Sequence, residues 1–221
     1  IPATAGAYDI TYNGGYWLGD GIVFKMNGDM SSLLWATFLG GTGDDFANGL
    51  RLDQKGDVVV TGYTDGPGFP TTAGVMNPNA LGGLSDAFIA VLGNNGAQLN
   101  ASSFLGTSGD DYAFLTDLDE SGNIYVCGTT TGTLTPSGGV YANAGSGLFI
   151  ESMNPALTAL NFLTVYGSGT PLTYSWDFVM TAFLVDVCNN IYVSGYGETN
   201  GFPVSSNAIQ TTTDGQDFHL L

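Results

Sequence analysis

Apolar and polar residues alternate along this chain in short runs, and glycine, asparagine, aspartate and proline separate the runs. A period of two residues brings apolar side chains to one face of an extended strand, so the pattern predicts β-strands and requires no helix. In the most regular stretch it predicts four strands, at residues 47–53, 57–64, 86–92 and 99–105. A long segment with prolines, residues 65–85, lies between the second strand and the third.

One period relates these runs to each other. A hairpin motif that begins at Asp53 begins again at Asp119, 66 residues later, and at Asp186, 67 residues after that. A Phe-Leu-Gly motif followed by paired aspartates, residues 38–46, returns at residues 104–112. The third marker is a proline, at Pro2, Pro70, Pro136 and Pro203. Three markers that share a period of about 67 residues indicate about 3.3 repeat units in this chain.

Each hairpin motif carries the residues of a tight turn. The Asp53 side chain can close a type I turn, and Gly56 can supply the positive φ that follows it. Gly122 stands at the same place in the second copy. The third copy has Asn189 there, the residue type that next most readily adopts this left-handed geometry. The motif therefore predicts a strand, a turn and a second strand in all three copies.

Four antiparallel strands repeated in tandem can bury their faces by stacking radially, as the blades of a β-propeller do. The sequence thus predicts an all-β fold, an arc of a β-propeller with four-stranded antiparallel blades. Because propellers close with roughly four to eight blades, we expect a piece of a longer protein. Residues 1–221 form a single propeller segment, divided as 1–46 (the end of one blade), 47–112 and 113–178 (two blades) and 179–221 (the start of the next).

Composition limits the partners of the chain. Lys25, Arg51 and Lys55 are the three basic residues against 20 acidic ones, which gives a formal net charge of −17. That charge repels phosphate backbones and anionic lipid headgroups, so we expect no nucleic-acid partner. No apolar run approaches the roughly 18 residues of a membrane-spanning helix, and we expect no membrane insertion.

Five segments carry a resemblance to a known family. They are an Asp-Ala-Phe strand at 86–88, a tryptophan-bearing strand that ends in Leu-Gly-Gly at 34–41, a Gly-Asp-Asp corner at 43–45, an Asp-x-x-Gly-Asn hairpin at 119–123 and a Phe-Pro-Thr-Thr segment at 69–72. Together they resemble the SBBP repeats, the seven-bladed propeller repeats of large secreted bacterial proteins. The resemblance covers nearly the whole chain.

The last third, at residues 186–195 and 201–204, resembles versions in large surface proteins of gliding Bacteroidota, which the type IX secretion system exports. The resemblance implies an extracellular or outer-cell-surface location. It also implies the partners: other modules of the same polypeptide, the type IX translocon or surface glycans. The chain departs from the family pattern at Leu134, where phenylalanine is usual near the repeated proline, and at residues 174–177, which interrupt the third corner.

Paired carboxylates are the candidate metal ligands. Asp44, Asp45, Asp110 and Asp111 stand at two equivalent corners and could bind Ca²⁺, which takes oxygen ligands. The alternative is that each aspartate accepts backbone N–H bonds at the start of a strand. Calcium needs 6–8 oxygens and each corner shows two carboxylates, which favours the structural role. We therefore expect no cofactor, with calcium as the open alternative.

Two tryptophans are the candidate ligand-stacking residues, because Trp17 and Trp176 lie in irregular stretches where their rings could stack on sugars. Catalysis has little support. His219 is the single histidine, and Glu151 and Glu198, the carboxylates outside turns, do not recur in the repeat. The two cysteines occupy different repeat positions, so we expect both to be free and Cys127 to be buried.

The sequence thus favours a non-enzymatic propeller segment that serves as an adhesion or display scaffold in a secreted or cell-surface bacterial protein. Its long connecting segments, residues 65–85, 130–146 and 198–216, would supply variable surface. Two alternatives stay open. One is a cargo or accessory protein of the type IX translocon, and the other is a carbohydrate-active enzyme on a propeller scaffold.

Overall fold

Antiparallel β-strands make up the regular secondary structure of the computed structural model, which describes residues 2–17, 19–174, 177–197, 203–210 and 217–220. No helix occurs in this part of the chain, and hence none that could cross a membrane. Its strands are β1 (Gly21–Met26), β2 (Leu33–Leu39), β3 (Asp45–Leu52), β4 (Val58–Thr64), β5 (Asp86–Leu92), β6 (Leu99–Leu105), β7 (Asp111–Leu118), β8 (Ile124–Thr130), β9 (Leu148–Met153), β10 (Leu160–Tyr166), β11 (Phe178–Val185), β12 (Ile191–Gly197) and β13 (Asp217–Leu220).

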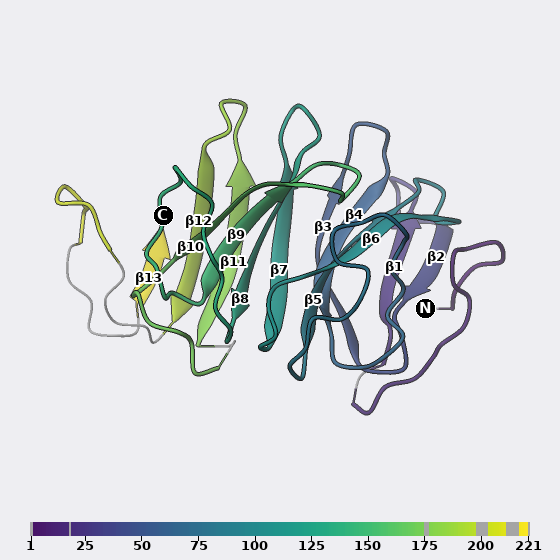
Figure 1. Cartoon of the computed structure of the whole chain (residues 1–221). Helices are drawn as coiled ribbons and strands as arrows, with labels where there is room; N and C mark the ends of the chain where they lie inside the picture. The colour runs from purple at the N-terminus through teal and green to yellow at the C-terminus, as the bar shows by residue number, and fades with distance from the viewer. Residues whose placement is uncertain (1, 18, 175–176, 198–202, 211–216, 221) are drawn as a thin grey trace.

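The strands form four sheets that follow one another across Figure 1 in chain order. Two sheets are complete and have the strand orders β3-β4-β5-β6 and β7-β8-β9-β10, so each strand pairs with the next along the chain. The first sheet consists of β1 and β2, and the last of β11, β12 and β13. The predicted all-β class and the antiparallel pairing are confirmed.

The predicted strand bounds agree closely with the observed ones. Strands β5 and β6 have the predicted bounds, 86–92 and 99–105. Strand β4 begins at Val58, one residue late. Strand β3 begins at Asp45, two residues earlier than predicted, because Asp45 already pairs with Thr64.

The three hairpin turns have the predicted geometry. Gly56 and Gly122 both have φ of +81°, and Asn189 has φ of +62°. Within the first turn, Asp53 Oδ1 accepts hydrogen bonds from the backbone N–H groups of Lys55 at 2.8 Å and Asp57 at 2.9 Å. Asp119 and Asp186 accept the equivalent pair of bonds in their own turns. Local side-chain chemistry is therefore enough to close each hairpin.

A β-bulge in the first strand of three sheets faces a repeated glycine. In β3 the bulge lies between Ala47 and Gly49, and Ala47 pairs with Gly62 of β4. A Cβ atom at Gly62 would overlap the carbonyl oxygen of Phe46 and approach the ring of Phe88. The same holds for the other two members of the series, Gly128 and Gly195. The bulge brings backbone so close that only glycine fits.

The repeated prolines introduce a segment that lies along the free edge of the fourth strand. Thr72 N–H donates to the carbonyl oxygen of Ser102 at 3.1 Å, and Ser102 N–H donates back to Thr72 Oγ1 at 3.0 Å. The same exchange joins Thr4 to Ala36 and Ser137 to Leu163. These segments were expected to be variable surface, but part of each one protects an exposed strand edge.

Apolar side chains fill the spaces between successive sheets. Between the first and second sheets, Val23 and Trp35 pack with Val60 and Phe88. A second cluster joins the second sheet to the third, and a third cluster joins the third sheet to the last. Phe88 is fully buried. Each interior sheet therefore has one face covered by the preceding sheet and the other by the following sheet.

Gly62→Ala tests the fit between glycine and bulge. We expect it to lower the free energy of unfolding by about 3 kcal/mol, because overpacking forces the bulge away from its partner strand. Urea denaturation measures the change. Gly28→Ala is the control, since a Cβ at Gly28 has no atom within 4 Å, and its effect should stay within about 0.5 kcal/mol. Equal losses in the two variants would contradict this explanation.

Candidate functional site

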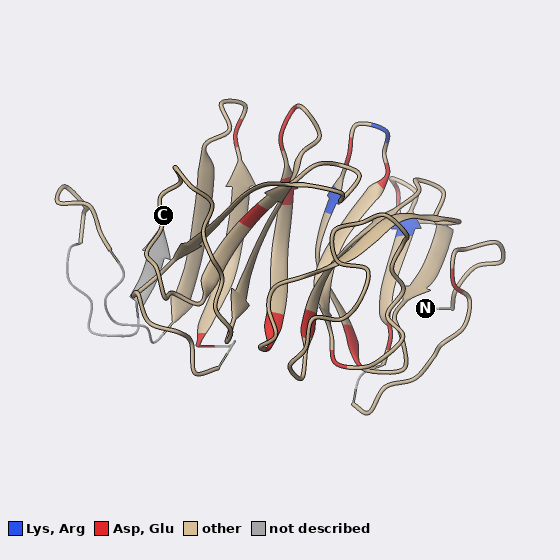
Figure 2. Ribbon diagram, in the orientation of Figure 1, with Lys and Arg blue, Asp and Glu red and all other residues tan. Residues whose placement is uncertain are grey.

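Carboxylates gather where the first and third strands of the sheets begin, at the lower end of Figure 2. Asp45 begins β3, Asp86 begins β5 and Asp111 begins β7. Asp44 and Asp110 precede two of these strands. The four aspartates proposed as metal ligands therefore lie at one end of the sheets, in two equivalent corners.

The first aspartate of each corner connects two sheets. Asp44 Oδ1 accepts a hydrogen bond from Gly19 N–H at 2.7 Å, just before β1. Asp110 Oδ1 accepts the equivalent bond from Leu84 N–H at 2.6 Å, just before β5. Each carboxylate thus holds the segment that leads into the preceding sheet.

The second aspartate of each corner closes its own turn. Asp45 Oδ2 accepts from Gly41 N–H at 2.9 Å, and Asp111 Oδ2 accepts from Thr107 N–H at 2.7 Å. Both side chains are buried. Burial removes water from the carboxylates and raises the pKa of Asp45 and of Asp111 to about 6.

These contacts fit a structural role, because N–H donors surround the carboxylates. Oδ1 of Asp45 and Oδ1 of Asp20 are buried without a hydrogen-bond partner, and these two oxygens are what the first corner offers a cation. Within the described residues, no group of three or more His, Cys, Asp or Glu side chains is placed to hold a metal ion. Calcium needs 6–8 oxygens, so the calcium interpretation remains a prediction.

Trp17 lies on the surface beside a second aromatic residue. Its side chain is 79% exposed, and that of Tyr16 is 85% exposed. The two rings meet edge to face, with centroids 4.9 Å apart. The Trp17 N–H donates to Asp44 Oδ2 at 2.8 Å, which holds the backbone of this pair to the acidic corner. Trp176, the other proposed stacking residue, lies outside the described residues.

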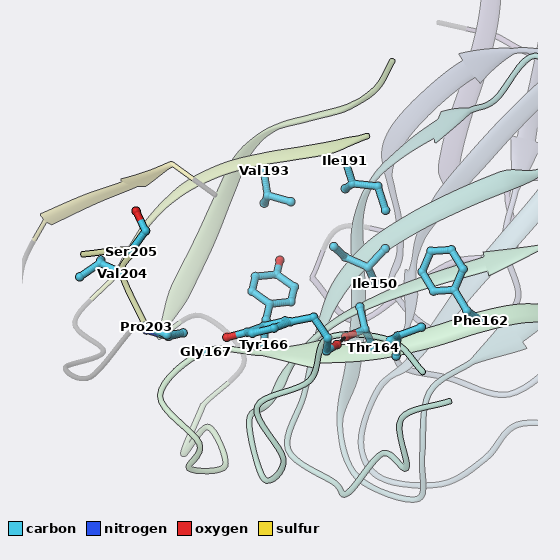
Figure 3. Close-up of a pocket in the computed structure, with 12 residues that line it drawn as sticks. Ile150, Phe162, Thr164, Tyr166, Gly167, Ile191, Val193, Pro203, Val204 and Ser205 are labelled. Carbon is cyan, nitrogen blue, oxygen red and sulfur yellow. Dashed lines mark hydrogen bonds between the residues drawn. The ribbon is translucent and has the colours of Figure 1, made fainter. Parts of the chain in front are cut away.

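An apolar cavity of about 740 Å³ lies between the third sheet and the last. Figure 3 shows Ile191 and Val193 of β12 across from Ile150 of β9 and Tyr166 of β10, with Pro203 at one side. The volume falls within the range of small-molecule sites. The lining includes no carboxylate, histidine or cysteine, so these walls suit an apolar group and supply no acid or base.

The sequence gave no signal for this cavity, because its walls come from separate parts of the chain. The third sheet, the last sheet and the segment after the fourth repeated proline each contribute residues that look like ordinary core positions. One weak signal exists: Tyr141, at the rim, is an aromatic residue that is 65% exposed.

Glu151 is a buried carboxyl group inside β9. It pairs across the sheet with Val126 and Leu163, both buried and apolar, and is itself 7% exposed. Removal from water, and to a lesser extent the charge of Asp111, raises the pKa of Glu151 to about 7. This pKa suits a general acid, but Glu151 does not line the cavity. Glu198, its proposed catalytic partner, lies outside the described residues.

The cysteines agree with the sequence analysis. Both are free, with Cys127 buried and Cys188 exposed. Burial raises the pKa of the Cys127 thiol to about 12, so the thiol stays protonated and unreactive at neutral pH. His219 lies in β13, and its side chain lies outside the described part of the chain.

No protein-family model matches this chain, and no curated protein matches it. The functional argument therefore depends on the residues and their geometry. That geometry offers a structural role for the corner aspartates, an exposed aromatic pair and an apolar cavity.

Glu151 makes stability depend on pH. The raised pKa means that the folded state holds a proton that the unfolded state releases, so this stabilisation is complete below about pH 4.5 and is lost as the pH rises through about 7. We expect Glu151→Met to raise the free energy of unfolding at pH 8 by about 3 kcal/mol, which is the pKa difference at about 1.4 kcal/mol per unit. Urea denaturation at pH 5 and pH 8 measures it, and the gain at pH 5 should be much smaller.

Glu120→Gln is the control for the Glu151 variant, because Glu120 lies in an exposed hairpin turn and should leave the pH dependence unchanged. Asp45 and Asp111 also have raised pKa values, so some decline with pH will persist in the Glu151 variant. An equal gain at pH 5 and pH 8 would show that Glu151 is not the titrating group.

Asp110→Ala separates the structural role of the corner from calcium binding. Loss of the bond to Leu84 N–H should lower the free energy of unfolding by about 1.5 kcal/mol, the range for a hydrogen bond to a charged group. The loss should be the same in excess CaCl₂ and in EDTA, as measured by urea denaturation. A loss confined to the calcium-containing buffer would identify Asp110 as a metal ligand.

Proposed function

We propose that this chain is an arc of a β-propeller and serves as a non-enzymatic scaffold in a large secreted or cell-surface bacterial protein. One observation carries the proposal. Two complete four-stranded sheets and parts of two more repeat one design, in which a bulge, a hairpin turn and a protected outer edge recur at the repeat period. Sheets that stack in this way are the blades of propellers.

The chemistry of the described residues supports a scaffold. The corner aspartates that could have served as acids or ligands accept backbone hydrogen bonds instead. Glu151, whose pKa would suit an acid, lies inside a sheet among apolar neighbours. The groups with catalytic potential are thus used to hold the fold together.

The resemblance to the SBBP repeats supports the proposed location. It favours an extracellular or outer-surface protein exported by the type IX system, with other modules of the same polypeptide as its neighbours. A net charge of −17 agrees with a role away from nucleic acids and anionic lipids.

The exposed pair Tyr16 and Trp17 is the proposed adhesive surface, with surface glycans as the ligand. Aromatic faces stack on the apolar faces of sugar rings, and both side chains are largely exposed. The pair lies beside an acidic corner, which favours neutral or cationic sugars over acidic ones.

A glycan array followed by a hydrolysis assay tests this function. We expect binding of neutral polysaccharides without turnover, and Trp17→Ala should weaken that binding roughly tenfold. Tyr141→Ala is the matched control, because Tyr141 is also an exposed aromatic residue but lies at the cavity. Hydrolysis that Glu151→Gln abolishes would replace the scaffold with a glycosidase. Binding that is equally strong in the Trp17 and Tyr141 variants would remove the adhesive surface.

A further inference from the structure

The last sheet exposes a face that is buried in the sheet before it. Tyr125 of β8 and Tyr192 of β12 occupy the same repeat position, and each donates its hydroxyl to the aspartate of its own hairpin, Asp119 or Asp186. Tyr125 is 6% exposed because the last sheet covers it, whereas Tyr192 is 44% exposed. The local structure is the same, so the difference is the missing neighbour. Leu184, which pairs with Tyr192, is also exposed.

The first sheet exposes the opposite face. Ile22 and Phe24 of β1 stand one repeat before Phe88 and Ala90 of β5, since Gly21 and Ala87 make the equivalent pairs in their sheets. Phe88 and Ala90 are fully buried against the first sheet. Phe24 is 43% exposed.

The first sheet also has an open strand edge. Strand β1 pairs with β2 on one side, and within the described residues no strand pairs with its other side. Its counterpart β5 has both sides paired, with β4 and β6. An unpaired edge beside an apolar face is a typical site of association between chains.

We propose that the first sheet of one copy of this chain docks on the last sheet of a second copy, head to tail. We call the two surfaces the first-sheet face (Ile22, Phe24 and Leu34) and the last-sheet face (Leu184 and Tyr192). Within the chain, three interfaces already join the face of one sheet to the opposite face of the next. The two end surfaces are the two unmatched halves of that same interface, so a second copy brings the chemistry that each half lacks.

The contact is heterologous, because the two surfaces differ and each copy uses one of them. Growth can therefore continue from either end unless the copies close into a ring. A net charge of −17 on each copy opposes the contact, and salt should strengthen it by screening the repulsion. This inference does not depend on the proposed adhesive function or on the location of the protein.

Sedimentation velocity of the 221-residue chain in high salt tests the proposal. We expect the average mass to rise with protein concentration. Phe24→Asp should abolish the rise by damaging the first-sheet face, and Leu184→Asp should abolish it by damaging the last-sheet face. Leu52→Asp is the control, because Leu52 is 61% exposed but lies on an interior sheet, and it should associate like the unaltered chain.

Mixing the two blocked variants gives the sharper result. Each keeps one intact surface, so an equimolar mixture should form one-to-one dimers although neither variant associates alone. Circular dichroism and urea denaturation establish that each variant is folded, and Tyr192→Asp replaces Leu184→Asp if that variant is not. A chain that stays monomeric at all concentrations, or a mixture that forms no dimer, would overturn the proposal.

Discussion

Contacts between residues one repeat apart join the first strands of successive sheets, and the arrangement of the whole chain depends on them. Asn48 Nδ2 donates to the carbonyl oxygen of Ala113 at 3.0 Å, and Arg51 Nε donates to Asp117 Oδ1 at 3.1 Å. The other oxygen of Asp117 accepts from Val185 N–H at 2.8 Å. One carboxylate thus links three sheets. A sheet that lost this alignment would move its apolar face away from the next sheet, so polar contacts at the inner strands fix the packing of the apolar ones.

The same economy explains why so few charges suffice in this chain. A buried carboxylate is costly unless hydrogen bonds satisfy it, and here backbone N–H groups do so at every described corner that has one. The cost remains visible in the raised pKa values of Asp45, Asp111 and Glu151. Asp45 and Asp111 are compensated by the turns that they close. Glu151 is not, because its repeat counterpart Ala90 shows that the position requires no polar group.

Local chemistry decided which features the sequence could predict. The hairpin turn depends on Asp53 and Gly56, which are three residues apart, and the alternating pattern marks β5 and β6 directly. The edge contact of Thr72 with Ser102 joins residues 30 apart, and the repeated proline showed its place but not its partner. The cavity required knowledge of which sheets are neighbours. For the corner aspartates the alternatives were correct, but only the positions of N–H groups could favour one of them.

The third corner shows how such a repeat can change without losing its fold. Phe178 stands where Asp45 and Asp111 stand in the earlier units, so one carboxylate of the pair is absent. Its ring is buried and packs over Gly195, at the place where Phe88 packs over Gly62 in the second sheet. In the last sheet the residue that pairs with Gly195 is His219, so the aromatic ring over the glycine comes from the first strand instead of the third. The constraint that persists is the filled space above the glycine, because the bulge beneath it admits no side chain, and the sequence is free to fill that space from either strand.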